Sequence, residues 1–198
     1  MQSINANDYS IHFSQNSYTF LNEFIEENNY SSIFILVDSN TNEYCLPHFL
    51  PYLATTKTIE IIEIEAGEEQ KSIESCVEIW KILTELGGDR KSVLINLGGG
   101  VITDLGGFVA STFKRGIDFI NIPTSLLAMV DASVSEKNGV DLGNLKNQIG
   151  VIYVPKMVLI DSEYLADLPQ NEMRSGLAEM LKHGLIYDKN YWEKFINL

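Results

Sequence analysis

Residues 92–108 read SVLINLGGGVITDLGGF, and this stretch decides the fold expected for the chain. Its first part, Ser92–Leu97, is a short β-branched and apolar run, which is typical of a buried strand. Gly98-Gly99-Gly100 follow directly, and a helix is expected from about Val101 to Phe113. Glycines at such a junction let backbone N–H groups and a helix N-terminus face an anion, and a pyrophosphate would suit them. A tight turn without a ligand is the alternative, because Thr103 stands where the usual G-x-G-x-x-G fingerprint requires glycine.

Neighbouring segments extend the pattern in both directions. Further strands are expected at Ser32–Val37, Thr58–Ile64 and Ile117–Ile122, and a helix at Ser72–Leu86. Strands alternating with helices predict a Rossmann-like α/β fold with a parallel sheet. Ligands bind beyond the carboxyl ends of such strands. One rim is therefore expected to carry Asp38, the Ala66–Lys71 loop, Gly98–Gly100 and Thr124.

The pattern changes in the last third of the chain. Residues 131–147 contain several glycine and asparagine breaks and are hard to interpret as a packed element, and long irregular segments are often functional. From Pro169 onward the sequence looks helical, so a domain boundary is expected near 162–168. Residues 1–165 then form an α/β domain, and residues 166–198 begin an all-α domain.

Composition and charge exclude several classes of protein. The 198 residues include 27 Asp and Glu against 14 Lys and Arg, a net charge of -13 that argues against nucleic-acid binding. Residues 1–90 hold 15 acidic and 4 basic side chains, whereas residues 91–198 hold 12 and 10, so the second part suits an anionic ligand. No run approaches the ~18 apolar residues of a membrane helix, and no signal peptide is visible, so a cytoplasmic protein is expected. Cys45 and Cys76 are interpreted as buried or idle thiols.

The stretch Arg174–His183, RSGLAEMLKH, places Glu179, Lys182 and His183 on one face of the expected helix. Glu179 and His183 are spaced to bind one metal ion, but a zinc site normally has three protein ligands. Spacing alone favours a surface ion pair between Glu179 and Lys182.

Taken together, these segments resemble the 3-dehydroquinate synthase family of sugar-phosphate cyclases, which is related to glycerol dehydrogenase. The resemblance runs from about Ser32 to Tyr187. It rests on G-E-x-x-K at 67–71, GGGVxxDLxGF at 98–108, KRGIDFINIPTSLLAMVDASV at 114–134, KNxIG at 146–150 and RSGLAEMLKHG at 174–184.

This resemblance implies an activity. The family converts 3-deoxy-arabino-heptulosonate 7-phosphate, an anionic sugar-acid phosphate, to 3-dehydroquinate and phosphate in the shikimate pathway of aromatic amino acid biosynthesis. NAD oxidises one ring alcohol, which acidifies the neighbouring C–H for phosphate elimination, and the hydride then returns. The cofactors implied are NAD and a divalent metal, zinc or cobalt. A homodimer is expected, without nucleic acid or membrane partners.

The resemblance also assigns residues to roles. Those around NAD are Asp38, Glu68, Lys71, Gly99, Gly100, Val101, Asp104, Thr124, Ser125, Lys137 and Lys146. Those around the substrate are Arg115, Asp131, Lys137, Lys146, Asn147 and Lys182, of which Arg115, Lys137, Asn147 and Lys182 are the expected catalytic residues. Four of these side chains are cations, as a doubly anionic substrate requires. Glu179 matches the family's carboxylate metal ligand.

The sequence departs from the family pattern at three places. The usual V-G-G-K-T-G reads Val134-Ser-Glu-Lys-Asn-Gly139, Thr103 replaces a glycine, and the family's two metal-binding histidines belong to a longer helical C-terminal domain. The chain is therefore expected to be the N-terminal part of such an enzyme, without a complete catalytic centre. A related sugar-phosphate cyclase or polyol dehydrogenase is one alternative, disfavoured by Arg115, Lys137 and Lys146, and a non-catalytic nucleotide-binding remnant is another.

Overall fold

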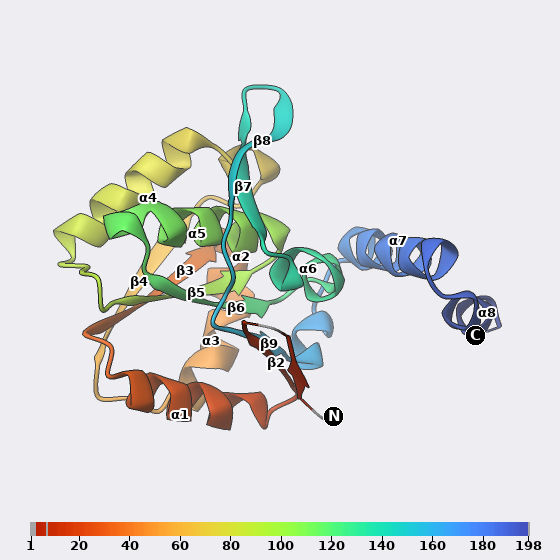
Figure 1. The fold of residues 1–198 in the computed structure, drawn as a ribbon, viewed down its shortest axis with the longest axis horizontal. Helices are drawn as coiled ribbons and strands as arrows, with labels where there is room; N and C mark the ends of the chain where they lie inside the picture. The colour runs from red at the N-terminus through yellow and green to blue at the C-terminus, as the bar shows by residue number, and fades with distance from the viewer. Residues whose placement is uncertain (1–2, 7, 198) are drawn as a thin grey trace.

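The computed structural model of the chain describes residues 3–6 and 8–197 and is built around a seven-stranded sheet (Figure 1). The strand order is β1-β2-β9-β6-β5-β3-β4, parallel throughout except for the β1–β2 pair. The sheet contains β1 (Ile4–Asn5), β2 (Ser10–Phe13), β3 (Ser32–Asp38), β4 (Thr58–Ile64), β5 (Val93–Gly98), β6 (Asp118–Pro123) and β9 (Met157–Ile160). The helices are α1 (Ser17–Asn28), α2 (Ser39–Tyr44), α3 (Leu46–Phe49), α4 (Ile73–Glu85), α5 (Gly100–Thr112), α6 (Leu126–Val130), α7 (Gln170–Ile186) and α8 (Lys189–Ile196).

The predicted Rossmann-like fold is confirmed, and so are the strands and helices on which it was based. Strand β5 is central, with Ile95 aligned to Ile35 of β3 on one side and to Ile120 of β6 on the other. All six β5 residues are buried, as expected for a parallel strand covered on both faces. The hydrophobic patterns of the sequence before residue 30 are weaker, and β1, β2 and α1 were not predicted.

Two layers of helices cover the two faces of the sheet (Figure 1). Successive side chains of a strand point to opposite faces, so β3 divides its apolar residues between two cores. Ile33 and Ile35 join the core beneath α1 and α3, whereas Phe34 and Leu36 join the core beneath α4 and α5. The alternation fixes the register, because a one-residue slip would exchange the two sets.

Paired glycines let α5 lie unusually close to its neighbours. A Cβ at Gly106 would overlap the side chain of Asn96 in β5, and one at Gly107 would overlap Asn138. These glycines follow the N-terminal turn of α5, so they hold that turn close against the carboxyl end of β5.

Residues 131–147 correct the sequence interpretation, since most of them are not irregular. They include the antiparallel hairpin of β7 (Lys137–Leu142) and β8 (Leu145–Ile152), with a register shift between Val140 and Leu142. The turn at Gly143 has φ 58°, a conformation that glycine adopts without strain. The hairpin projects beyond the sheet (Figure 1).

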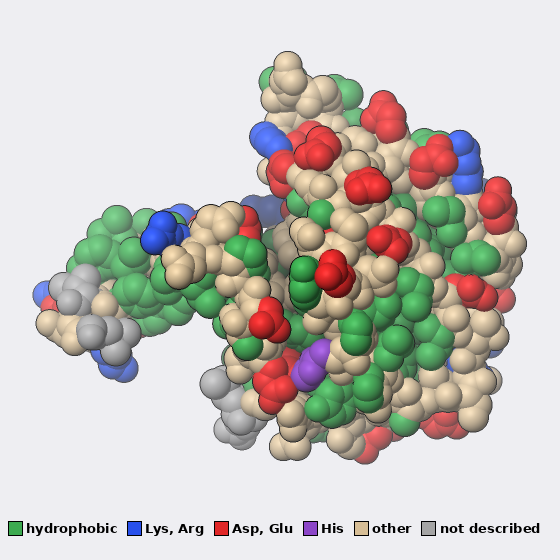
Figure 2. Space-filling view, turned by 180° about the vertical axis from the view of Figure 1, so that it is seen from behind, with side chains coloured by type: hydrophobic (Ala, Val, Ile, Leu, Met, Phe, Trp, Pro, Cys, Tyr) green, Lys and Arg blue, Asp and Glu red, His purple; other side chains and the backbone are tan. Residues whose placement is uncertain are grey.

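The C-terminal helices extend to one side of the sheet (Figure 1). Helix α7 reaches the main body at α6, where a Cβ on Gly176 would lie 2.5 Å from Leu126 Cβ. Beyond this contact the side chains of Leu185 and Ile186 are exposed, and Figure 2 shows a hydrophobic surface over this arm. The domain boundary near 162–168 stays a prediction. Among the helices that the structure describes, none has the length and apolar character needed to cross a membrane.

Candidate functional site

A large cleft opens at the carboxyl ends of β3, β5 and β6, where the sequence predicted a ligand rim. Its volume of about 1180 Å³ exceeds the ~300–1,000 Å³ that is usual for small-molecule sites. Ten of the predicted site residues line it: Asp38, Glu68, Lys71, Gly99, Gly100, Val101, Asp104, Thr124, Ser125 and Asp131. Apart from Glu69, Gln70 and Gly98, the residues of the predicted rim therefore lie on one continuous surface.

The N-terminus of α5 faces this cleft. Gly99 is the N-cap residue, and no side chain among the described residues caps this end of the helix. The first intrahelical bond runs from Thr103 N–H to Gly99 C=O at 3.0 Å, so the N–H groups of Gly100, Val101 and Ile102 precede it. Free N–H groups at the start of a 13-residue helix form a site for an anion such as a pyrophosphate.

Thr103 does not disturb this arrangement, although it replaces a glycine usual in the family. Its side chain is buried and is directed away from the cleft lining. Its hydroxyl donates to Gly100 C=O at 3.2 Å within the helix. The departure at this position therefore leaves the anion-facing surface of α5 open.

A buried ion pair lies at the floor of the cleft. Lys71 Nζ donates to Asp104 Oδ2 at 2.5 Å and to Asn147 Oδ1 at 2.7 Å, and only 8% of the Lys71 side chain is exposed. Burial raises the pKa of Asp104, and the positive charge of Lys71 opposes that shift. Lys71 thus joins α5 to the β7–β8 hairpin and places a positive charge beside Asp104.

The hairpin is also attached to the loop before α4. Lys146 Nζ contacts Glu68 Oε1 at 2.7 Å and Asp141 Oδ2 at 2.9 Å, and the Asn147 N–H donates to Asp141 Oδ1 at 2.7 Å. Those hydrogen bonds lower the pKa of Asp141. Asn147 has φ 52°, the left-handed conformation that asparagine tolerates best after glycine. Lys146 and Asn147 therefore contact residues that line the cleft.

Two predicted cofactor residues also have local structural roles. Asp38 caps α2 in a capping box, accepting from Thr41 N–H at 2.8 Å while its own N–H donates to Thr41 Oγ1 at 2.9 Å. Ser125 caps α6 by accepting from Ala128 N–H at 3.3 Å. Caps hold short helices in place at the ends of strands, so these residues set the shape of the cleft wall.

Glu179 lies in a second polar cluster, which adjoins the cleft at Asp131. One ligand atom from each of Asp131, Glu179 and His183 lies within 4.8 Å of the others. His183 Nε2 is 3.2 Å from Glu179 Oε1, and Lys182 Nζ pairs with the same oxygen. The hydrogen bond to Glu179 raises the pKa of Lys182.

This donor set is compatible with a divalent metal. Glu179 Oε1 is buried, and in the described part of the chain Lys182 Nζ and His183 Nε2 are its close polar neighbours. Carboxylate and imidazole donors are the usual oxygen and nitrogen ligands of zinc. The ion pair between Glu179 and Lys182, which the sequence spacing favoured, is present. It involves the same carboxylate that a metal would require.

The structure does not bring two predicted residues to the cleft. Arg115 follows α5 in a turn at its C-terminal end, and a 13-residue helix separates it from Gly100 by about 20 Å at ~1.5 Å per residue. Lys137 begins β7 and is exposed outside the cleft lining, as is Glu136.

One wall of the cleft was missed by the sequence analysis. It comes from α2 and from the start of α7 and contains Asn40, Thr41, Tyr44, Leu168, Pro169, Asn171 and Ser175. The signal that could have located its first part is Thr41 three residues after Asp38, a spacing typical of a helix N-terminus following a strand.

Comparisons with known proteins agree with this geometry. The family model described as 3-dehydroquinate synthase N-terminal matches residues 61–175. The 3-dehydroquinate synthase of Parabacteroides distasonis is 46% identical over 166 residues, which cover 84% of this chain and 47% of that protein. That of Campylobacter hominis is 42% identical over 189 residues, covering 95% of this chain and 55% of the relative. The chain thus spans about half the length of these curated relatives.

Two of the solved structures with the same fold are sugar-phosphate cyclases. 2-Deoxy-scyllo-inosose synthase complexed with carbaglucose-6-phosphate, NAD+ and Co2+ aligns with a TM-score of 0.84 at 25% identity, over 93% of this chain and 51% of that chain. ValA, a 2-epi-5-epi-valiolone synthase from Streptomyces hygroscopicus with NAD+ and Zn2+ bound, aligns with a TM-score of 0.82 at 27% identity, over 96% of this chain and 53% of that chain.

Proposed function

Because the chain belongs to the 3-dehydroquinate synthase family, we propose that the protein containing it converts 3-deoxy-arabino-heptulosonate 7-phosphate to 3-dehydroquinate and phosphate. The chain would contribute the cofactor cleft, one metal ligand and part of the substrate site. The observation that carries this proposal is the uncapped N-terminus of α5, which opens into the cleft between Lys71 and Thr124.

NAD is the cofactor proposed for the cleft. The N–H groups of Gly100 and Val101 would donate to the pyrophosphate, and the absence of side chains at Gly99 and Gly100 allows close approach of the backbone. Asp38, at the end of β3, has the position and the acceptor chemistry to bind a ribose hydroxyl. Bound NAD would supply the reversible oxidation of a ring alcohol. In support, two structural neighbours have NAD+ bound.

The second group proposed is a divalent metal at Glu179. Asp131 and His183 lie close enough to Glu179 to support a metal there, and Asp131 also lines the cleft, so the ion would stand at the cofactor's edge. A metal in this position would polarise the alcohol being oxidised and orient the sugar. The metal would have to displace Lys182 Nζ from Glu179 Oε1, which releases the ammonium group for an anionic substrate.

The chain's own cations would balance the substrate's charge. Lys146 pairs with Glu68 and Asp141, and Lys182 pairs with Glu179, so each is neutralised by a carboxylate in this structure. Asn147 would hold Lys71 in position through its side chain, while its backbone N–H donates to Asp141 within the hairpin. Arg115 and Lys137 lie outside the cleft lining, and their expected catalytic roles stay predictions.

Phosphate release is the direct test. The protein that contains this chain, purified and supplied with NAD+ and Zn2+, is expected to release phosphate from the heptulosonate phosphate and to show no release from glucose 6-phosphate. Release from glucose 6-phosphate instead would favour a related cyclase, and NAD+ reduction by glycerol would favour a polyol dehydrogenase. The homodimer expected from the sequence stays part of this proposal and is tested by sedimentation equilibrium.

A further inference from the structure

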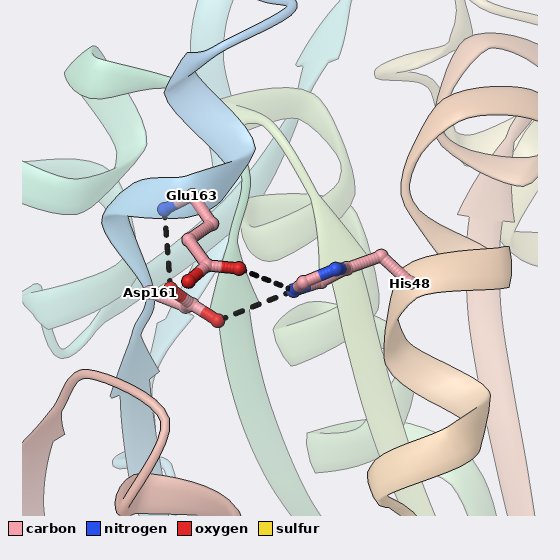
Figure 3. A group of neighbouring side chains, drawn as sticks. All are labelled: His48, Asp161 and Glu163. Atoms are coloured by element: carbon pink, nitrogen blue, oxygen red, sulfur yellow. Dashed lines mark hydrogen bonds and ion pairs between the residues drawn. The ribbon is translucent and has the colours of Figure 1, made fainter.

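Three side chains that the proposed function does not use point toward one another beside the cleft (Figure 3). They are His48 of α3, together with Asp161 and Glu163 at the turn after β9. His48 Nε2 lies 3.4 Å from Asp161 Oδ2 and 3.7 Å from Glu163 Oε2. More than 110 residues of sequence separate His48 from the two carboxylates, so only the fold brings them together.

The spacing of these atoms suits a shared cation better than hydrogen bonds. Hydrogen bonds from a ring nitrogen to oxygen are usually ~2.9–3.0 Å long, and both distances at His48 Nε2 are longer. Two ligands of a tetrahedral zinc ion with bonds of ~2.0–2.1 Å stand about 3.3 Å apart. Atoms from all three residues lie within 4.8 Å of one another, so small side-chain shifts would place them around one ion.

The charge of Asp161 also calls for a cation. Its side chain is almost fully buried, and it accepts from Tyr18 Oη at 2.9 Å and from the Glu163 N–H at 3.1 Å. Both donors are neutral, and burial is the main cause that raises the pKa of Tyr18. Within residues 3–6 and 8–197, no Lys or Arg forms an ion pair with Asp161. A buried carboxylate beside a second carboxylate is costly unless a positive charge accompanies it.

Outer contacts hold the three side chains in orientation. Gln15 Nε2 donates to Glu163 Oε1 at 2.7 Å, which leaves Oε2 directed at His48. The Tyr164 ring stands edge-on to the His48 ring, with centroids 5.1 Å apart and planes at 82°. Metal ligands in proteins are typically oriented by such second contacts.

We propose that His48, Asp161 and Glu163 bind a divalent transition-metal ion, zinc in the first instance, at a site separate from Glu179. The donor set of one imidazole and two carboxylates suits zinc or cobalt. A cavity of about 160 Å³ opens against His48 and Glu163 and leaves room for water as the fourth ligand. Thr124 and Pro169 line both this cavity and the large cleft, so the ion would stabilise one wall of that cleft.

Zinc binding to the metal-free E179Q protein tests the proposal, because this substitution weakens metal binding at the Glu179 cluster. We expect one equivalent of Zn2+ by calorimetry, and Co2+ is expected to give the visible absorption of a four-coordinate site. H48Q in the same background should weaken Zn2+ binding at least ~100-fold, since losing even an outer contact costs ~10–100-fold. H183Q is the matched control, because it makes the same substitution in the Glu179 cluster. It should leave the affinity for the one bound Zn2+ unchanged.

A second variant keeps the test decisive if H48Q fails to fold by circular dichroism. E163Q changes a side chain that is 53% exposed, and it should weaken Zn2+ binding about tenfold or more without loss of helix signal. Two results overturn the proposal: no Zn2+ bound by E179Q at millimolar ion, or binding that is unchanged in E163Q and in a folded H48Q. The readout is metal affinity, so the outcome does not depend on phosphate release.

Discussion

Replacing Lys71 with methionine perturbs the cleft at its most buried charge. The variant K71M removes the ammonium group that pairs with Asp104 at 2.5 Å and leaves a methylene chain of similar length in the same space. Breaking a buried ion pair from one side typically costs ~3–5 kcal/mol, because the remaining charge is left without compensation. Since 19% of the Asp104 side chain is exposed, we expect a loss near the lower end of that range.

The pH dependence of K71M has a predicted sign. Burial raises the pKa of Asp104 and Lys71 opposes the rise, so the pKa should rise further in the variant. A carboxyl group whose folded-state pKa exceeds its unfolded value, ~3.9, favours folding below that value and loses this contribution as the pH rises through the folded pKa. The deficit of K71M relative to the parent protein should therefore be smallest at acid pH and should grow toward pH 7.

Urea unfolding followed by circular dichroism measures both effects, with an unchanged m-value as the sign of a two-state comparison. K81M is the matched control: Lys81 pairs with Glu78 at 2.8 Å on an exposed helix face, so its loss should cost no more than ~0.5 kcal/mol. The double variant K71M/D104L removes both charges and should recover most of the lost stability. A K71M deficit below 1 kcal/mol, or additive effects in the double variant, would refute the buried-pair reasoning.

Three further variants or reactions test other parts of the structure. Burial raises the pKa of Cys45 to about 11 and that of Cys76 to about 12. At pH 8 both thiols of the folded protein should therefore react with DTNB at least ~100-fold more slowly than the thiols of the protein unfolded in guanidinium, and equal rates would contradict this burial. G176A should cost ~1–3 kcal/mol in urea unfolding, because its Cβ would lie 2.5 Å from Leu126 Cβ, and a neutral effect would show that α7 does not pack closely on α6. G100D should keep or raise the melting temperature, because an acidic residue suits a helix N-terminus and the atoms nearest to the new Cβ are 3.6 Å away. The same variant should weaken NAD+ binding at least tenfold, and an unchanged NAD+ affinity would show that the pyrophosphate does not bind at this helix end.

The central part of the fold could be predicted because its signals are local. Buried parallel strands have continuous apolar sequences, and Ser32–Val37 and Ser92–Leu97 each match a strand to within a residue or two. The isoleucine-rich Thr58–Ile64 matches the edge strand β4. The hairpin of β7 and β8 could not be recognised in the same way. Strand β8 is largely exposed, and the hairpin is held by cross-strand pairing and by Lys71, which is distant in sequence.

The residues of the site also differ in whether a local sequence signal predicts them. Positions at the ends of predicted strands, such as Asp38, Gly99 and Thr124, follow from the rule that ligands bind at those ends, and they meet in one cleft. Arg115 was assigned by family resemblance, and the length of α5 then places it at the far end of the helix. The cluster around His48 gave no signal at all, because three residues without a shared motif become neighbours only through tertiary packing.

Calorimetric titration of the purified protein with NAD+ tests the cofactor cleft most directly. Saturable binding of one NAD+ per chain, at least tenfold weaker in G100D and unaffected in K81M, is the predicted result. Absence of heat at millimolar NAD+, in protein whose folding is confirmed by circular dichroism, would contradict the assignment of the α5 N-terminus as a pyrophosphate site.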